Sequence, residues 1–211
     1  MPPTVDELFI AAPPDPWAAV GFAVDGDTCE VGTVRLRLED GPGRGITAWS
    51  VRDQDQRDLD GLDTRASQAP SAQAGPHPNG TLSIDHLVAI TPDLDRTAAV
   101  LQEAGFDLRR LREGDTPGGS QRQAFFRMGE LILEVVQAPP DTKIAADPAG
   151  PARLWGISFR VGDMQAPAAA LGDSLGEPRD AVQPGRRIAT VAGGAGLGPA
   201  VAFMTPGPGA A

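Results

Sequence analysis

An internal repeat restricts the fold of this chain more than any single motif does. The block at 81–137 is expected to form a strand, a helix and three further strands, over 81–91, 93–104, 106–112, 123–127 and 130–137. Pro92 and Asp93 stand where a helix opens, and Gly105 stands where it ends. The sequence therefore predicts a β-α-β-β-β unit.

A second block, 152–206, repeats this order. HLVAITPDLD in the first block aligns with GISFRVGDMQ in the second, and LILEVVQ aligns with AVAFMT. Residues 1–52 match more briefly, with DELFIAAPPD over DHLVAITPDL and an additional strand at 45–52. A compressed third copy and a chance match are both compatible with so short an alignment.

These blocks predict an α+β fold of paired βαβββ modules, whose cupped mixed sheets surround a cavity with the helices outside. Modules 81–138 and 152–206 are expected to pair into one domain, 81–206, because their helices have similar lengths. Residues 1–52 would then be a compressed half-module that covers a sheet edge or pairs with a second copy of the chain in a homodimer. The polar segment 53–80 is typical of a linker.

Composition excludes several classes of protein. The chain of 211 residues has a net charge of −10, which argues against a nucleic-acid partner. No apolar run is long enough for a membrane span, so no membrane partner is expected. Cys29 is the only cysteine, so an intramolecular disulfide and an all-cysteine zinc site are excluded, and a reducing cytoplasmic location is expected.

Strand parity places a histidine and a carboxylate on cavity-lining faces. His86 shares one face of its strand with Val88, and the helix is expected to cover the opposite face, which carries Leu87. Glu134 lies among apolar residues of another strand, where an unpaired carboxylate is costly. A divalent metal would satisfy both groups, whereas a lone histidine in a strand is more often a hydrogen-bonded structural residue.

The segments IDHLVAITPDLDRTAAVLQEAGF and ELILEVVQ resemble the vicinal-oxygen-chelate superfamily of glyoxalases, bleomycin-resistance proteins, extradiol dioxygenases and epimerases. The resemblance puts His86 and Glu134 in the places of metal ligands. It implies a small-molecule lyase, isomerase or dioxygenase, in which Zn, Ni, Fe or Mn acts as a Lewis acid on the vicinal oxygens of a substrate.

The sequence also departs from that pattern. The position over His86 is Gly156 in the block 152–206, and the position over Glu134 is Ala202, so pairing of these modules leaves two ligands. In the first block, Glu7 lies over His86 and Arg37 over Glu134. Pairing of the first two blocks would instead give the metal ligands Glu7, His86 and Glu134, with Glu134 and Glu7 as the catalytic carboxylates.

Other residues are candidates for contact with a substrate. They are flat, hydroxyl-bearing or cationic side chains expected in or beside the cavity: Trp155, Ser158, Arg160, Phe126, Arg122 and Arg187. The alternative function is a metal-free binding or sequestering module of the bleomycin-resistance type, in which these residues dominate and His86 only forms hydrogen bonds. A third hypothesis is a structural relict whose contacts serve oligomerisation.

Overall fold

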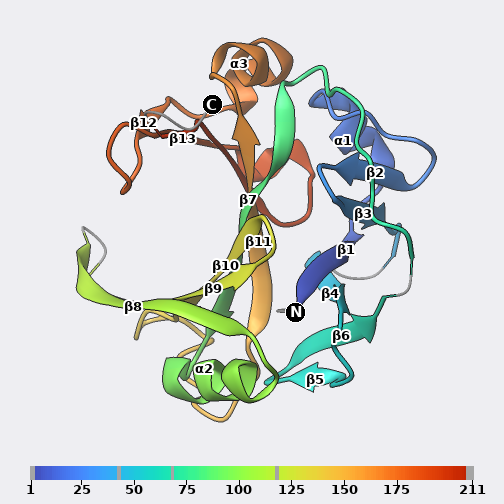
Figure 1. The fold of residues 1–211 in the computed structure, drawn as a ribbon. Helices are drawn as coiled ribbons and strands as arrows, with labels where there is room; N and C mark the ends of the chain where they lie inside the picture. The colour runs from blue at the N-terminus through green and yellow to red at the C-terminus, as the bar shows by residue number, and fades with distance from the viewer. Residues whose placement is uncertain (1–2, 42–43, 68, 117–118, 208–211) are drawn as a thin grey trace.

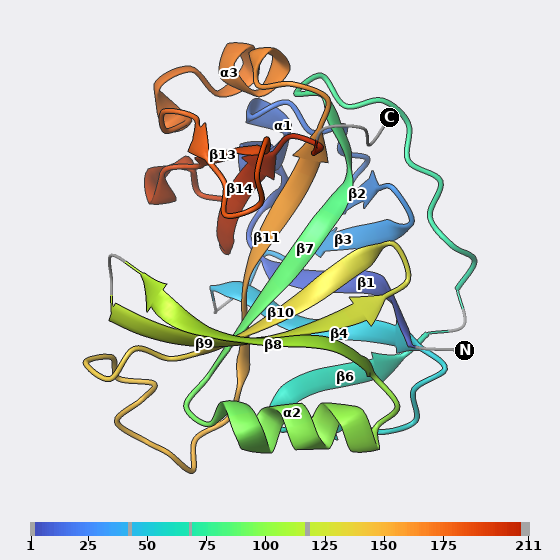
Figure 2. The same cartoon turned by 60° about the vertical axis from the view of Figure 1, so that its left-hand side comes forward.

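The computed structural model describes residues 3–41, 44–67, 69–116 and 119–207 and contains two mixed sheets (Figures 1 and 2). The N-terminal sheet has the order β2-β3-β1-β4-β6-β5. Its strands are β1 (Thr4–Ala11), β2 (Thr28–Val31), β3 (Val34–Leu38), β4 (Gly45–Arg52), β5 (Asp58–Leu59) and β6 (Leu62–Ala66). The helix α1 (Pro14–Ala19) follows β1.

The C-terminal sheet has the order β12-β13-β14-β11-β7-β10-β9-β8. Its strands are β7 (Thr81–Thr91), β8 (Asp107–Thr116), β9 (Gly119–Met128), β10 (Leu131–Gln137), β11 (Arg153–Val161), β12 (Arg179–Asp180), β13 (Arg187–Thr190) and β14 (Ala200–Met204). The helices are α2 (Leu94–Glu103) and α3 (Gln165–Leu171), with short 3₁₀ turns at Gly172–Ser174 and Gly193–Ala195. No helix among the described residues is long and apolar enough to cross a membrane.

The C-terminal sheet confirms the predicted pair of βαβββ modules. In each module the first strand lies parallel to the last, β7 beside β10 and β11 beside β14. The two modules meet where β7 pairs antiparallel with β11. Helix α2 begins at the predicted cap, because the Asp93 carboxylate accepts a hydrogen bond from the Arg96 amide at 3.0 Å.

The N-terminal sheet has the same plan on a smaller scale. β1 lies parallel to β3, β4 lies parallel to β6, and β1 pairs antiparallel with β4. The central pairings β1–β4 and β7–β11 share one register, with an extra residue at Asp6 in β1 and at Asp85 in β7. Matching pairs are Thr4–Arg52 with Ser83–Arg160, Val5–Val51 with Ile84–Phe159, and Glu7–Ser50 with His86–Ser158.

This architecture corrects two expectations. Residues 58–59 and 62–66 form β5 and β6, so part of the expected linker 53–80 belongs to a fourth unit that starts with β4. The residues 1–52 do not simply cover a sheet edge, because with β5 and β6 they build a sheet of their own. Short, polar strands such as 62–66 (LDTRA) carry too little apolar pattern to be distinguished from a linker.

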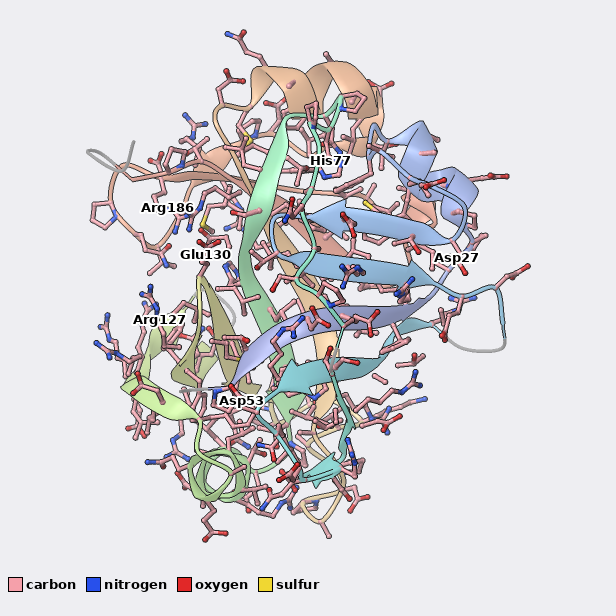
Figure 3. The ribbon with its side chains drawn as sticks, turned by 45° about the vertical axis from the view of Figure 1, so that its right-hand side comes forward. Asp27, Asp53, His77, Arg127, Glu130 and Arg186 are labelled. Carbon is pink, nitrogen blue, oxygen red and sulfur yellow. The ribbon has the colours of Figure 1, made fainter. Side chains whose placement is uncertain are left out.

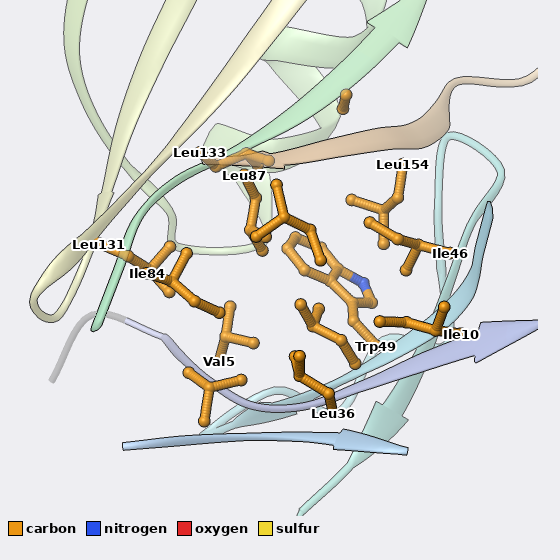
Figure 4. Close-up of a cluster of buried hydrophobic side chains, with 14 of the residues drawn as sticks. Val5, Ile10, Leu36, Ile46, Trp49, Ile84, Leu87, Leu131, Leu133 and Leu154 are labelled. Carbon is orange, nitrogen blue, oxygen red and sulfur yellow. The ribbon is translucent and has the colours of Figure 1, made fainter. Parts of the chain in front are cut away.

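The two sheets pack back to back around one hydrophobic core (Figure 4). Leu8, Leu36 and Trp49 of the N-terminal sheet and Leu87 and Leu133 of the C-terminal sheet are fully buried. The Trp49 indole donates a 2.8 Å hydrogen bond to the Thr64 hydroxyl. Because Leu87 points into this core, His86 lies on the opposite face of the C-terminal sheet, as strand parity predicts.

We expect Trp49→Ala to lower the free energy of unfolding by about 3–5 kcal/mol, because it empties a large site in the shared core. Urea unfolding followed by circular dichroism should still show one transition, since both sheets depend on that core. The matched control is Trp155→Ala, which removes an indole that is 53% exposed and should change stability by less than about 1 kcal/mol. Two separate transitions in the native protein would contradict a shared core.

Candidate functional site

The face of the C-terminal sheet that carries His86, Glu134, Ser158 and Arg160 is called the cup here. Three neighbouring cavities of about 430, 340 and 170 Å³ lie on this face, and His86 lines all three. The largest is polar and is lined by charged residues of both modules, among them Arg127, Glu130 and Arg186, which Figure 3 shows on one side of the molecule. The second is mainly apolar and is bounded by Trp155, Val88, Ile188, Val191 and Val201.

His86 lies between two carboxylates. Its Nδ1 atom is 3.0 Å from Asp85 Oδ2, and its Nε2 atom is 3.8 Å from Glu134 Oε2. The short distance to Glu134 confirms the expectation that these two side chains are neighbours. Asp85 reaches His86 because the β-bulge adds a residue to β7 at this point, so that both side chains lie on the cup.

Asp85 is held as a carboxylate. Burial alone would raise its pKa, but hydrogen bonds from His86 and Arg186, together with their charges, lower the pKa to about 2. In addition, the Arg160 Nε atom lies 3.6 Å from Asp85 Oδ1. An ionised carboxylate can only accept, so the Nδ1 atom of His86 carries the proton, and the Nε2 atom that faces Glu134 is free in the neutral ring.

Glu134 has the opposite electrostatic setting. Burial raises the pKa of its carboxyl group, and the nearby His86, Gln123 and Arg112 only partly oppose that effect. The Gln123 side-chain amide donates to Glu134 Oε1, which leaves Oε2 toward the imidazole. The arrangement therefore places a basic nitrogen and a carboxyl group with a raised pKa next to each other at the meeting point of the cavities.

Three of the predicted substrate residues lie at the cup. Arg160 lines the polar cavity, and Trp155 and Ser158 line the apolar one. Ser158 pairs across the strands with His86 and is only 2% exposed. Arg187 does not line these cavities, because its guanidinium donates to the Pro178 carbonyl and lies near Asp180. The preceding residue, Arg186, takes the inward place.

Phe126 and Arg122 also lie elsewhere than predicted. Phe126 is fully buried in the core, and Arg122 pairs with Asp95 and Glu113 outside the cup. Phe125 and Gln123 line the cup instead. The sequence held the necessary signal: any two-residue turn between β9 and β10 pairs even-numbered residues with odd-numbered ones, so Glu134 shares its face with Phe125 and Gln123.

Glu7 is not brought to His86. It lies on the N-terminal sheet, where Arg37 Nη2 is 2.7 Å from its carboxylate and the Ser50 hydroxyl donates to it at 3.3 Å. The shared register puts this Glu7–Arg37 ion pair at the place that His86 and Glu134 occupy in the other sheet. Within the described ranges, no group of three or more His, Cys, Asp and Glu residues could hold a metal ion.

No protein-family model and no curated protein sequence matches this chain. Among solved structures, it is similar to a xylose isomerase-like TIM barrel/4-hydroxyphenylpyruvate dioxygenase fusion protein, with a TM-score of 0.64 and 14% identity over 99% of this chain and 50% of that one. Methylmalonyl-CoA epimerase from Mycobacterium tuberculosis is similar with a TM-score of 0.50 and 18% identity, over 65% and 94% of the two chains. The chain thus spans about half of the fusion protein, and at these identities the likeness concerns the fold.

We expect Asp85→Asn to lower the free energy of unfolding at pH 7 by about 2 kcal/mol, the equivalent of the shift from 3.8 to about 2 in the Asp85 pKa. A carboxylate with a lowered pKa stabilises the fold above its unfolded pKa, and that stability is lost as the pH falls through the folded value. The difference between wild type and variant should therefore shrink between about pH 4 and pH 2.

Urea unfolding at pH 7 and at about pH 2.5, in the lower part of that range, measures this difference. The control is Asp180→Asn, because the Asp180 side chain is almost fully exposed and should contribute little at either pH. A penalty for Asp85→Asn that is the same at both pH values would show that the Asp85 charge does not stabilise the fold.

Proposed function

This chain has the fold of the vicinal-oxygen-chelate superfamily, and we propose that its cup binds and acts on a small organic acid that carries a second oxygen beside the acid group. The observation that carries the proposal is the line of contacts from Arg186 through Asp85 and His86 to Glu134. It gives the site an oriented imidazole for proton transfer, and the neighbouring Arg160 supplies a cation for the acid group.

The cationic side chains favour an anionic ligand. Arg127, Arg160 and Arg186 line the same polar cavity. Three acids also line it: Asp85, which is already paired with Arg186, Glu130, and Glu134, whose pKa is raised by burial. Arg160 is only partly engaged by Asp85, at 3.6 Å, and its side chain is 44% exposed, so its guanidinium is available for bidentate contact with a carboxylate. The apolar cavity on the other side of His86 would receive the rest of the ligand against the Trp155 indole.

His86 would act as the general base. Its Nε2 atom would take a proton from the carbon beside the carbonyl group of the ligand, and the electron pair of the broken C–H bond would move onto the carbonyl oxygen. The guanidinium groups of Arg160 and Arg186 would stabilise the negative charge on that oxygen. Asp85 would orient the imidazole and stabilise the imidazolium, and return of the proton completes an exchange or an isomerisation.

Binding without turnover is the second candidate function. The exposed Trp155 beside Gly156 leaves open surface that a flat ligand can cover, which favours a sequestering module. Trp155 and Arg160 would then dominate affinity, and His86 would serve only as a hydrogen-bonding group.

We expect the wild-type protein to speed deuterium exchange at the carbon beside the carbonyl group in an alkyl or aryl 2-oxo acid. Proton NMR in D₂O, over a panel of such acids, measures the exchange rate. His86→Gln should lose about 10²- to 10⁴-fold in that rate, because it removes the base. Arg160→Gln should weaken binding, whereas Arg153→Gln, at the exposed start of the same strand, should leave binding unchanged.

Saturable binding of these acids without any exchange would favour the sequestering module. Exchange by His86→Gln at the wild-type rate would refute the assignment of His86 as the base.

A further inference from the structure

We infer that the cup works without a resident divalent metal ion, because only one of its two modules supplies donor groups. The inference rests on the proposed function of the cup. The fold family implies a metal at this place, so the donor set of the chain itself decides whether one fits.

The first module supplies two donors. His86 Nε2 and Glu134 Oε2 are 3.8 Å apart, a distance that two ligands of one metal ion could have. Protein sites for Zn or Fe commonly use three or four protein donors, however. One or two further donors would have to come from the other module or from nearby acids.

The second module has no donor at the matching positions. β7 and β11 pair antiparallel, with His86 opposite Ser158 and Val88 opposite Gly156. A twofold rotation that exchanges the two strands therefore puts Gly156 in the place of His86, and Ser158 in the place of Val88. In the same way Ala202, beside Ser158, takes the place of Glu134, beside Val88. A Cβ atom on Gly156 would lie 2.9 Å from the Ala200 carbonyl oxygen, so the backbone of β14 also leaves no room for a ligand side chain there.

The nearby acids are engaged elsewhere or exposed. Asp85 accepts from His86 and Arg186, and the Arg160 guanidinium beside it adds a further positive charge that would repel a metal. Glu130 lines the polar cavity but is exposed at the turn between β9 and β10, and among the described residues it forms no metal-binding group with His86 and Glu134. Both modules of the cup belong to one chain, so a second copy of the chain cannot take the place of the second module and supply the missing donors. The positive charge that a metal would supply then has to come from Arg160 and Arg186.

Calorimetric titration with Mn²⁺, Ni²⁺ and Zn²⁺ tests the inference on protein purified without a histidine tag and treated with EDTA. We expect no wild-type binding tighter than about 100 µM. Ala202→Glu should bind at least one of these ions about tenfold or more tightly than wild type, because it adds a third donor at the place that matches Glu134. The 2-oxo acid exchange of the wild type should be unchanged by EDTA.

A tight site with about one ion per wild-type chain, lost in His86→Ala, would overturn the inference. So would restoration by metal of an exchange activity that EDTA had removed. Ala202→His is the second variant. If neither Ala202→Glu nor Ala202→His gains metal affinity, although both keep the wild-type melting temperature, the number of donors does not limit binding. That result also overturns the inference. The titrations remain decisive if no acid undergoes exchange, a result that would refute only the proposed function.

Discussion

The antiparallel pairing of β7 with β11, with its bulge at Asp85, is the constraint on which the site depends. It joins two modules into one curved sheet and sets which residues face each other across the centre. The bulge adds Asp85 to the same side as His86, where the carboxylate orients the imidazole and binds Arg186. A one-residue shift in this register would turn His86 into the core and destroy the cup.

The same pairing, used twice, explains how one chain builds two different surfaces. β1 and β4 repeat the register of β7 and β11, including the bulge at Asp6. In the N-terminal copy, the Asp6 carboxylate is bound by Arg52, and the central pair is Glu7 with Arg37. An ion pair at that position satisfies both charges within the sheet, so this copy supports the core from behind while the C-terminal copy keeps a basic nitrogen open to a cavity.

The sequence predicts the parts of this structure whose pattern is local. The β-branched run at 81–91 and the cap at Asp93 predict the first strand and helix of the module, and strand parity correctly puts His86 opposite the Leu87 face. The closeness of His86 to Glu134 also followed from parity together with the resemblance. The short strands within 58–66 escaped prediction because their polar residues resemble those of a linker.

Side-chain placements that depend on hairpin register, on a turn or on a bulge are harder to predict. Phe126 and Arg122 were assigned to the cup without the register of the β9–β10 hairpin, which gives Phe125 and Gln123 instead. Arg187 and Arg186 are equivalent candidates in the sequence, and only the turn before β13 decides which of them reaches Asp85. Parity does not predict Asp85 on the cup, because a bulge breaks the alternation on which parity relies.

The tautomer of His86 shows directly whether Asp85 orients the imidazole. Nitrogen NMR of the imidazole groups, at a pH where both rings are neutral, can resolve them easily because the chain has only two histidines. We expect His86 to carry its proton on Nδ1, toward Asp85. His77, whose Nδ1 atom accepts from the Ala23 amide at 3.0 Å, should carry its proton on Nε2 and serves as the internal reference. A His86 ring protonated on Nε2 would contradict an oriented base and, with it, the account of the cup.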